Sequence, residues 1–386
     1  MKFIHMKIAF LTPEFPHPKT GTSGGIGTSI FNLSKGLIQL GHQVSVIVYG
    51  QDKDEFFVAD GISFYKIKNK KLKGLSLFLS QKKAEKLINK LYQENKIDIV
   101  EAPDWTGFTA FIKPKCPLVI RLNGSDTYFC HLDKRPVKWI NKFLEKRALK
   151  RADGLISVSE FTGNLTNQLF GLSRKFVVIP NAIDILQFES SNSLDNSQTI
   201  LYFGTLIRKK GLLELPLIFN EVYAKNPLAK LILIGRDASD IMTGNSSVWQ
   251  MMIPLFNENA FKNVNYLGSI PYSEIKKHIQ KACVCVFPTF AEALPVSWIE
   301  AMAMRKPIVA SNIGWATEVI DDGINGFLVH PTNHLEYAYK VVTLLENTEL
   351  QKEFGIEARK KVEYKFSIEI VAKQSVLFYE NIIASK

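Results

Sequence analysis

Short apolar segments alternate with helical segments along both halves of this 386-residue chain. In the first half, the predicted strands are residues 8–11, 44–48, 97–100, 118–122, 154–157 and 176–179. In the second half, they are residues 201–204, 230–234, 264–267, 283–287, 308–310 and 326–329. Alternation of this kind is typical of parallel sheets with helices on both faces. The sequence therefore predicts an α/β protein built from doubly wound domains.

A polar stretch near the middle of the chain predicts the domain boundaries. Residues 190–198 have no apolar periodicity and read as a linker between residues 1–189 and residues 199–367. In doubly wound folds, ligands bind outside the carboxyl ends of the strands. With two such domains, we expect the two sets of strand ends to face each other across a cleft that holds the ligand.

One strand-loop-helix junction in the second half sets two carboxylates eight positions apart. Residues 283–287 predict a buried strand, Pro295 suits the first turn of a helix, and residues 297–304 continue as helix formers. Glu292 then lies on the loop and Glu300 on the helix. A helix start attracts phosphate through its free N–H groups and its dipole. A nucleotide sugar fits this arrangement, because its hydroxyl groups lie on both sides of a diphosphate.

This junction resembles the E-x7-E signature of the retaining GT-B glycosyltransferases of family 4, the group 1 transferases. The resemblance implies the GT-B fold, with two Rossmann-like domains facing an interdomain cleft. It implies that Glu292 contacts the donor sugar and that Glu300 contacts the ribose hydroxyls. It also implies further donor contacts from Ala293, Leu294 and Val296. Family members often carry Gly-Phe-Gly after the first Glu, and Pro295 at the third of these positions has no N–H to give a phosphate.

A second match opens the second half, where a strand and a turn precede three consecutive cations, Arg208, Lys209 and Lys210. The family usually has Arg directly after the strand glycine, here Gly204, and Lys five residues later, both on the diphosphate. Lys210 matches the Lys, but Thr205 stands where the Arg is expected. Either Arg208 substitutes for it or the phosphate clamp is weaker. The alternative is a solvated basic turn without a ligand.

Weaker matches complete the implied donor site. Residues 265–270 resemble the strand and loop whose backbone reads the nucleotide base in this family, which implies contacts from Ser269 and Ile270. The glycine-rich run 21–28 lies between the first predicted strand and helix, and glycines there let backbone approach a ligand closely. At this position it resembles the family's Gly-Gly loop near diphosphate and acceptor, with Gly25 as a donor contact. A glycine turn without a ligand is the alternative.

The candidate acceptor residues lie at two strand ends of the first half. Asn123 stands where many family members have His, and an amide cannot act as a general base. Asp126 is the candidate to orient or deprotonate the acceptor hydroxyl. Asp104 and Trp105 add an acid and an indole for acceptor sugars, although a Trp105 packed in the core is an equal alternative. By family analogy, the C-terminal helix 368–386 packs back on the first domain.

The net charge of +11 belongs entirely to the first half of the chain, because residues 1–190 hold 28 Lys and Arg against 17 Asp and Glu. The excess concentrates in the Lys66–Lys90 segment, where leucines and Phe78 are interleaved with lysines. A basic segment with exposed apolar side chains is how a peripheral protein holds an anionic bilayer. A solvated helix face is the alternative, and no nucleic-acid motif accompanies the charge.

Other classes of site and compartment are not favoured by the sequence. The four cysteines and seven histidines show no metal-ligand spacing, so no metal is expected and no cofactor besides the nucleotide-sugar substrate. No stretch approaches the ~20 apolar residues of a membrane span, and the start lacks the apolar core of a secretory signal. We therefore expect a cytoplasmic protein, peripheral at the inner face of the membrane if the basic segment binds lipid.

The resemblance implies a metal-independent, retaining hexosyltransferase that acts on a glycan or lipid-linked acceptor, in polysaccharide, lipopolysaccharide or glycoconjugate synthesis. Glu292, Lys210, Arg208 and Asp126 are its expected catalytic residues. In this reaction type, cations and helix starts stabilise charge on the departing diphosphate. Two other classes remain open: a GT-B nucleotide-sugar epimerase, and a non-catalytic nucleotide-sugar binder.

Overall fold

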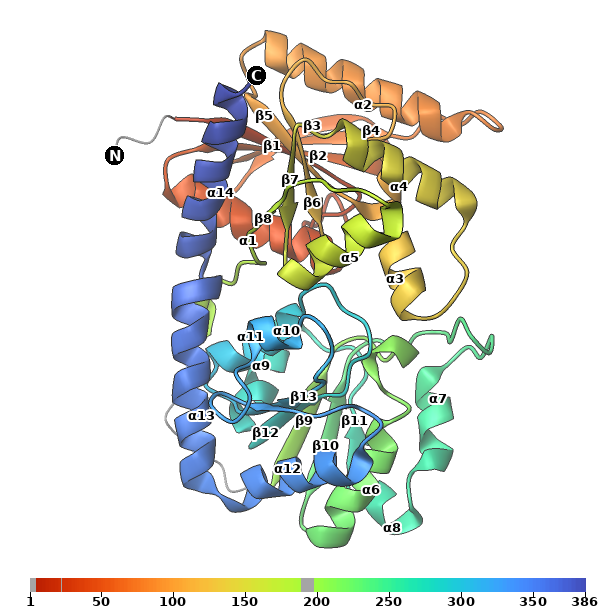
Figure 1. Ribbon diagram of the computed structural model, residues 1–386, viewed down its shortest axis with the longest axis vertical. Helices are drawn as coiled ribbons and strands as arrows, with labels where there is room; N and C mark the ends of the chain where they lie inside the picture. The colour runs from red at the N-terminus through yellow and green to blue at the C-terminus, as the bar shows by residue number, and fades with distance from the viewer. Residues whose placement is uncertain (1–4, 22, 189–197) are drawn as a thin grey trace. The chain divides into compact units, whose positions relative to one another are not determined.

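The computed structural model describes residues 5–21, 23–188 and 198–386 (Figure 1). The chain divides into two compact units, one formed by Met1–Ile183 with Lys365–Lys386 and the other by Asp184–Tyr364. The division falls earlier than the predicted end of the first domain at residue 189. Residues 189–197, which include nearly all of the predicted linker 190–198, lie outside the described residues.

The first unit contains an eight-stranded sheet in the order β3-β4-β2-β1-β5-β6-β7-β8. Its strands are β1 (Lys7–Thr12), β2 (Gln43–Gln51), β3 (Glu55–Ala59), β4 (Ile62–Lys68), β5 (Ile99–Pro103), β6 (Leu118–Leu122), β7 (Gly154–Ser157) and β8 (Val177–Val178). Its longer helices are α1 (Gly25–Gln39), α2 (Ser76–Gln93), α3 (Asp126–Leu132), α4 (Trp139–Arg151), α5 (Glu160–Phe170) and α14 (Ile368–Ala384). Only the edge strand β3 runs antiparallel to its neighbour among the described strands of this sheet.

Strands β3 and β4 form a hairpin that was not predicted, because we interpreted the lysines of this region as part of one basic segment. The turn between the strands holds Asp60 and Gly61, both with positive φ (50° and 75°). Asp-Gly between alternating apolar residues is a strong hairpin signal that the sequence contained. Lys66 on β4 is 7% exposed, and its Nζ lies 3.0 Å from Asp52 Oδ1. Lys66 is therefore not part of the basic surface, contrary to the prediction.

Helix α14 packs on α1 within the first unit (Figure 1). Its apolar face joins the cluster that contains strand β1 and helix α1. A buried polar network adds specificity: the Tyr379 hydroxyl donates to Glu101 Oε2 at 2.6 Å, and Arg121 Nε donates to Glu101 Oε1 at 2.7 Å. Arg121 also donates to the carbonyl of Ile179 at 2.9 Å. The chain end is thereby fastened to the middle strands of the sheet.

The second unit contains a six-stranded parallel sheet in the order β11-β10-β9-β12-β13-β14. Its strands are β9 (Thr199–Phe203), β10 (Lys230–Ile234), β11 (Val264–Tyr266), β12 (Val284–Phe287), β13 (Ile308–Ala310) and β14 (Phe327–Leu328). Its helices are α6 (Leu215–Lys225), α7 (Val248–Met252), α8 (Glu258–Phe261), α9 (Tyr272–Lys281), α10 (Val296–Ala303), α11 (Ala316–Val319), α12 (His334–Glu346) and α13 (Thr348–Lys361). Every predicted strand of both halves has a counterpart, so the prediction of two doubly wound α/β domains is confirmed.

Each sheet has one point where the strand order reverses. In the first sheet the chain places β2 on one side of β1 and β5 on the other, and in the second it places β10 on one side of β9 and β12 on the other. Loops that leave two such strands diverge to opposite faces of the sheet, which opens a crevice at the carboxyl ends. In the second unit, the loops after β9 and β12 are therefore the place where a ligand is expected.

Candidate functional site

In the second unit, the loops after β9 and β12 are held against each other by backbone contacts. The amide of Phe290 donates to the carbonyl of Lys209 at 2.8 Å. Gly211, with φ of 72°, lies so close to Pro288 that a Cβ would stand 1.7 Å from its carbonyl oxygen. Only glycine fits there. The relative position of the cationic turn and the Glu292 loop is thus set by the backbone rather than by the charged side chains.

These backbone contacts between the two loops place Lys210 next to Glu292. Lys210 Nζ lies 3.3 Å from Glu292 Oε1, with the two side chains 22% and 17% exposed. A Cβ built on Gly204 would stand 3.3 Å from the same Nζ, so the absence of a side chain at residue 204 leaves room for the ammonium group. The half-buried ammonium and carboxylate can each reach a ligand. The pair therefore offers one cation for a phosphate and one acceptor for hydroxyl groups.

Arg208, the predicted substitute for the missing family arginine, is paired with an acid of its own unit. Its Nε and one terminal nitrogen donate to the two oxygens of Asp240, each at 2.8 Å. Asp240 is 2% exposed and also accepts from the Thr243 hydroxyl at 2.6 Å, and the hydrogen bond from Arg208 holds the pKa of its carboxyl well below the usual range. The Arg208 side chain remains 39% exposed. Two of the hydrogen-bond donors of its guanidinium group are therefore already used by Asp240.

Thr205, which replaces the usual family arginine, is half-buried, and its carbonyl accepts a hydrogen bond from a buried side chain. The hydroxyl of the buried Tyr202 donates to this carbonyl at 3.1 Å. Burial and the charge of Glu292 raise the pKa of Tyr202 well above its ordinary value, so the phenol stays a donor. Tyr202 supports the turn that carries Gly204 and Thr205.

Glu300 lies on α10 and is buried, with 8% of its surface exposed. The hydroxyl of Tyr272, the first residue of α9, donates to Glu300 Oε1 at 2.5 Å. Burial raises the pKa of Glu300 to about 7, and the Tyr272 hydrogen bond with the charges of Lys276 and Lys210 opposes that rise. Glu300 thus changes charge near neutral pH. Its position on a helix and that of Glu292 on a loop confirm the predicted geometry of the junction.

The remaining donor candidates surround α10 and the end of β11. Ala293 and Leu294 are 5% exposed each, and Val296, the first residue of α10, is half-buried. Pro295 is the N-cap residue, with ψ of 114°, and so lies just before the helix rather than within its first turn as predicted. Ser269 is exposed and Ile270 half-buried in the loop that leads from β11 to α9. This loop ends at Tyr272, the partner of Glu300.

In the first unit, the glycine-rich run leads into α1, which begins at Gly25. The amide of Gly27 in the first turn donates to the carboxylate of Glu14 at 3.0 Å. A Cβ at Gly27 would stand 2.9 Å from the Glu14 carbonyl oxygen, so the loop after β1 is packed tightly against the helix start. Gly25 itself is exposed, with open space where a side chain would be. The glycines therefore serve the packing of the loop as well as any ligand.

Asp104 and Trp105 follow β5, but only Trp105 is accessible. Asp104 is 1% exposed, and its Oδ1 accepts from the backbone amide of Asn123 at 3.0 Å, while the buried Oδ2 has no hydrogen-bond partner among the described residues. Burial raises the pKa of Asp104 to about 8, with a smaller contribution in the same direction from the charge of Glu145. The prediction that Asp104 binds an acceptor is wrong, because its carboxyl group supports the turn after β6 from inside. Trp105 is half-buried.

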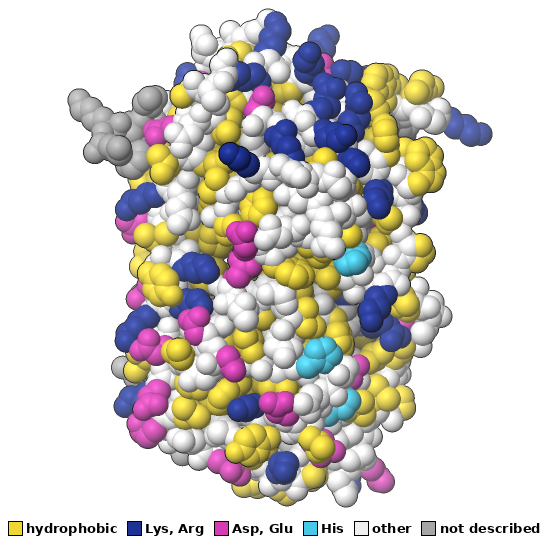
Figure 2. Space-filling model, viewed as in Figure 1, with side chains coloured by type: hydrophobic (Ala, Val, Ile, Leu, Met, Phe, Trp, Pro, Cys, Tyr) yellow, Lys and Arg dark blue, Asp and Glu magenta, His cyan; other side chains and the backbone are white. Residues whose placement is uncertain are grey.

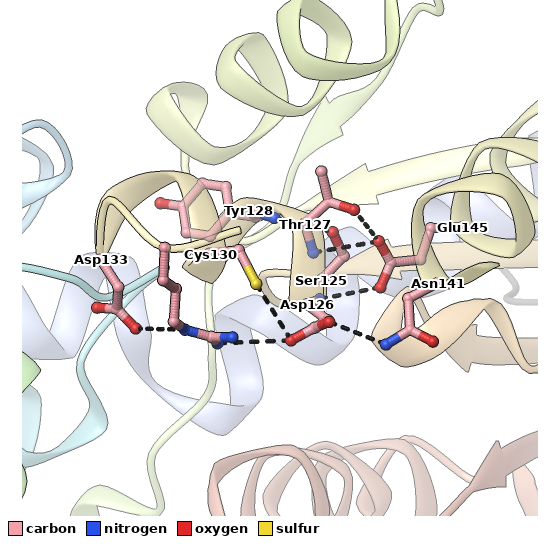
Figure 3. A network of polar contacts seen from close by, with 9 residues as sticks. Ser125, Asp126, Thr127, Tyr128, Cys130, Asp133, Asn141 and Glu145 are labelled. Carbon is pink, nitrogen blue, oxygen red and sulfur yellow. Dashed lines mark hydrogen bonds and ion pairs between the residues drawn. The ribbon is translucent and has the colours of Figure 1, made fainter. Parts of the chain in front are cut away.

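The turn after β6 carries Asn123. It leads into α3, where Asp126 lies within a network of polar contacts (Figure 3). Asp126 begins α3, and its carboxylate accepts from Asn141 at 2.9 Å and lies 3.5 Å from Arg135. The buried Glu145 accepts from the backbone amide of Asp126 at 2.9 Å and from the Thr127 hydroxyl at 2.5 Å, which ties the start of α3 to α4. Asn123 is half-buried. The structure thus orients Asp126 with two side chains of the segment after α3.

The polar residues that the sequence did not predict are Tyr202, Asp240, Tyr272 and Glu145. Asp240, Tyr272 and Glu145 each contact a predicted residue that lies far away in the sequence, and no spacing rule connects the two members. Tyr202 contacts the nearby Thr205, but only the turn after β9 brings its hydroxyl to that carbonyl. A partial signal existed for Tyr272, because it follows Pro271 at a helix start near the predicted base loop. In the described parts of the chain, no cluster of three or more His, Cys, Asp or Glu side chains could hold a metal ion.

Two α/β units built on largely parallel sheets, with a cation–carboxylate pair at the reversal point of one sheet, fit the GT-B fold of glycosyltransferases. Family models agree with this class: residues 184–361 match "Glycosyl transferases group 1" and residues 23–186 match "Glycosyltransferase Family 4". The chain therefore belongs to the family 4 (group 1) glycosyltransferases.

Individual relatives and structures are distant but match along most of the chain. An uncharacterized glycosyltransferase of Methanocaldococcus jannaschii is 26% identical over 97% of this chain and 98% of its own length. The alpha-monoglucosyldiacylglycerol synthase of Acholeplasma laidlawii is 25% identical over 81% of this chain and 82% of its own. The crystal structure of Anabaena HepE in complex with UDP-glucose matches with a TM-score of 0.73 at 21% identity, over 99% of this chain and 100% of that one.

Proposed function

We propose that the protein transfers a sugar, with retention of configuration, from a nucleotide-diphosphate sugar to a hydroxyl group of a glycan or lipid-linked acceptor. The observation that supports this most is the Lys210–Glu292 pair at the reversal point of the second sheet, 3.3 Å apart and partly open to solvent. In the proposed complex, Lys210 neutralises the departing diphosphate, and Glu292 accepts hydrogen bonds from the donor sugar. Glu300 accepts from the ribose hydroxyls.

The proposed acceptor residues belong to the first unit. Asp126 orients the acceptor hydroxyl, and Asn123 and Trp105 contact the acceptor sugar. The proton of that hydroxyl passes to the departing diphosphate, so no enzyme nucleophile and no metal ion enter the proposed reaction. The Acholeplasma relative is named as a synthase of a glycosylated diacylglycerol, which supports a lipid-linked acceptor as one alternative to a free glycan.

We also propose that the basic segment, beginning at Lys70 rather than Lys66, contacts an anionic membrane surface on which such an acceptor would lie. Among the described residues, no helix is long and apolar enough to cross a membrane. The cytoplasmic location expected from the sequence remains a prediction.

The first test is a thermal-shift series with UDP, GDP, ADP, dTDP and their common sugar conjugates, in wild type and in Glu300→Ala. We expect one nucleotide to raise the midpoint in wild type only, because the variant lacks the ribose acceptor. Nucleoside diphosphate release is then followed with that donor, with and without candidate acceptors and with EDTA. The anomeric configuration of the product is read by NMR.

The alternatives give different outcomes in these assays. Acceptor-independent conversion of the donor to an epimer would favour a nucleotide-sugar epimerase. Donor binding without turnover on any acceptor would favour a non-catalytic binder. Loss of transfer in EDTA, restored by a divalent ion, would contradict the metal-independent mechanism, and an inverted product would contradict retention.

A further inference from the structure

Two helices of the first unit begin with large apolar side chains that lie exposed to solvent. At the start of α4, Trp139 is 77% exposed, Phe143 48% and Ile140 39%. At the start of α2 and just before it, the exposed fractions are 52% for Leu72, 52% for Leu75, 44% for Leu77 and 40% for Phe78. Apolar side chains clustered at a surface indicate a binding partner, whereas single exposed ones do not.

The start of α2 and helix α4 are linked through Phe111. The ring of Phe78 on α2 packs edge-on against Phe111, with 5.6 Å between the ring centroids. The guanidinium of Arg147 on α4 lies 4.7 Å over the same Phe111 ring. Both helices begin on the same side of the unit (Figure 1). We call the surface formed by residues 70–78, Phe111 and the exposed side of α4 the α2–α4 face.

The charge of this face is positive. Helix α4 contains five cationic residues and one acid, Glu145, which is 1% exposed and bound to Thr127. The exposed side of α4 therefore carries only cations beside its apolar start. Near α2, Lys70, Lys71 and Lys73 are exposed, and none of the three forms a salt bridge to a described residue. Figure 2 shows Lys and Arg side chains gathered with hydrophobic ones over this part of the unit.

Cations beside exposed tryptophan, phenylalanine and leucine match the boundary layer of an anionic bilayer. Tryptophan prefers the depth of the lipid headgroups, and Lys side chains reach their phosphates. A second copy of the chain would set like charges face to face, and the cores of protein interfaces are depleted in Lys. Nucleic acid would leave the leucines without a partner. The face therefore fits lipid better than the other three candidates: a copy of itself, another protein, or nucleic acid.

We propose that the α2–α4 face docks on an anionic lipid bilayer, with Trp139, Ile140 and Phe143 inserted into the headgroup layer and the lysines on lipid phosphates. This rests on the membrane contact in the proposed function and extends it to α4, which the sequence did not single out. Docking through two helix starts also fixes the orientation of the first unit on the surface. Contact through the basic segment alone would leave the first unit free to rotate on the membrane surface.

The test uses the whole protein and vesicles of phosphatidylcholine, alone or mixed equally with phosphatidylglycerol. We expect wild type to sediment with the mixed vesicles at low salt. The double variant Trp139→Ala with Phe143→Ser loses apolar burial and should bind at least about tenfold more weakly. The variant Lys142→Gln with Lys146→Gln should weaken binding only at low salt. The matched control, Leu228→Ser with Ile241→Ser, removes side chains that are 72% and 71% exposed in the second unit and should bind like wild type.

A fluorescence measurement distinguishes insertion from simple adsorption. The emission difference between wild type and Trp139→Phe reports residue 139, and it should shift to the blue and be quenched by brominated lipid. Sedimentation of the Trp139 and Phe143 variant like wild type, or an unshifted difference spectrum, would overturn the proposal. A wild-type dimer that this variant converts to a monomer, without vesicle binding, would also overturn it and assign the face to a second copy.

Failure of the proposed function would look different. If the protein binds vesicles but turns over no nucleotide sugar, the docking proposal stands and the proposed transfer reaction is contradicted. If wild type and all these variants transfer sugar to a water-soluble acceptor and none binds vesicles, the transfer reaction stands and the docking proposal is contradicted.

Discussion

Lys210 and Glu292 of the second unit and Asp104 of the first unit all follow parallel strands, but the structure uses them in opposite ways. In the second unit, Lys210 and Glu292 stay 22% and 17% exposed and pair with each other across two loops. In the first unit, Asp104 is 1% exposed and bound to the backbone of a neighbouring turn. The comparison teaches that a polar residue after a parallel strand is not by itself a ligand contact. Whether its functional group is turned outward or inward decides between binding and support.

If this comparison holds, removing Lys210 has the largest effect on activity and little effect on folding. We expect Lys210→Ala to lower the rate of transfer by about 10²–10³-fold, because one cation facing the departing diphosphate is lost. The neighbouring Lys209→Ala is the matched control and should keep most of the activity. Equal losses in both variants, measured as initial rates of nucleotide release, would mean that only the net charge of the turn matters.

The second way to test the comparison uses the pH dependence of donor binding. Because the pKa of Glu300 is raised to about 7, its carboxylate forms as the pH rises through neutrality. We expect the affinity for a nucleotide sugar, whose diphosphate does not titrate in this range, to increase between pH 6 and pH 8 by up to about tenfold. Calorimetric titration of wild type and Glu300→Gln measures this, and the variant should lose the dependence.

Tyr272→Phe serves as the companion to that variant. It removes the hydrogen bond that lowers the pKa of Glu300, so the rise in affinity should move to higher pH. An unshifted profile would show that the Tyr272 contact does not tune this carboxyl group.

For Asp104 in the first unit we expect the opposite pattern, with an effect on stability rather than on activity. The pKa of Asp104 is raised to about 8 in the folded protein, so between its unfolded value near 4 and pH 8 the folded state holds a proton that the unfolded state releases. Its contribution to stability is complete below that unfolded value and is lost as the pH rises, by at most about 1.4 kcal/mol per pH unit. Asp104→Asn should flatten this slope in urea unfolding at pH 5.5 and 8. A wild-type slope in the variant would assign the pH dependence to other groups.

The smallest expected effect concerns the buried network of α14. Tyr379→Phe removes the 2.6 Å hydrogen bond to Glu101 and leaves Arg121 in place. We expect the free energy of unfolding to fall by about 1–3 kcal/mol, because a buried charge loses one donor. Urea unfolding measures this. An unchanged midpoint would show that apolar packing alone fastens the C-terminal helix.

The sequence by itself determined the α/β class, the two sheets and the strand-loop-helix junction of Glu292 and Glu300. These follow from local patterns: apolar strands, helix periodicity, and proline next to a helix start. The hairpin of β3 and β4 carried an Asp60-Gly61 signal that we did not weigh. Lys210 was also a sequence prediction, because its spacing from Gly204 matches a family motif, and the structure places it beside Glu292.

Only the tertiary structure decided which partners these residues have. Arg208 pairs with Asp240, and Tyr272 contacts Glu300, across segments that are distant in sequence. Asp104 and Lys66 are likewise buried by segments that lie far from them in the sequence. Local patterns report which face of a strand or helix is apolar, but not which charged group lies opposite after packing. Burial and charge pairing depend on that packing, so the ionisation and the accessibility of a polar side chain are properties of the fold.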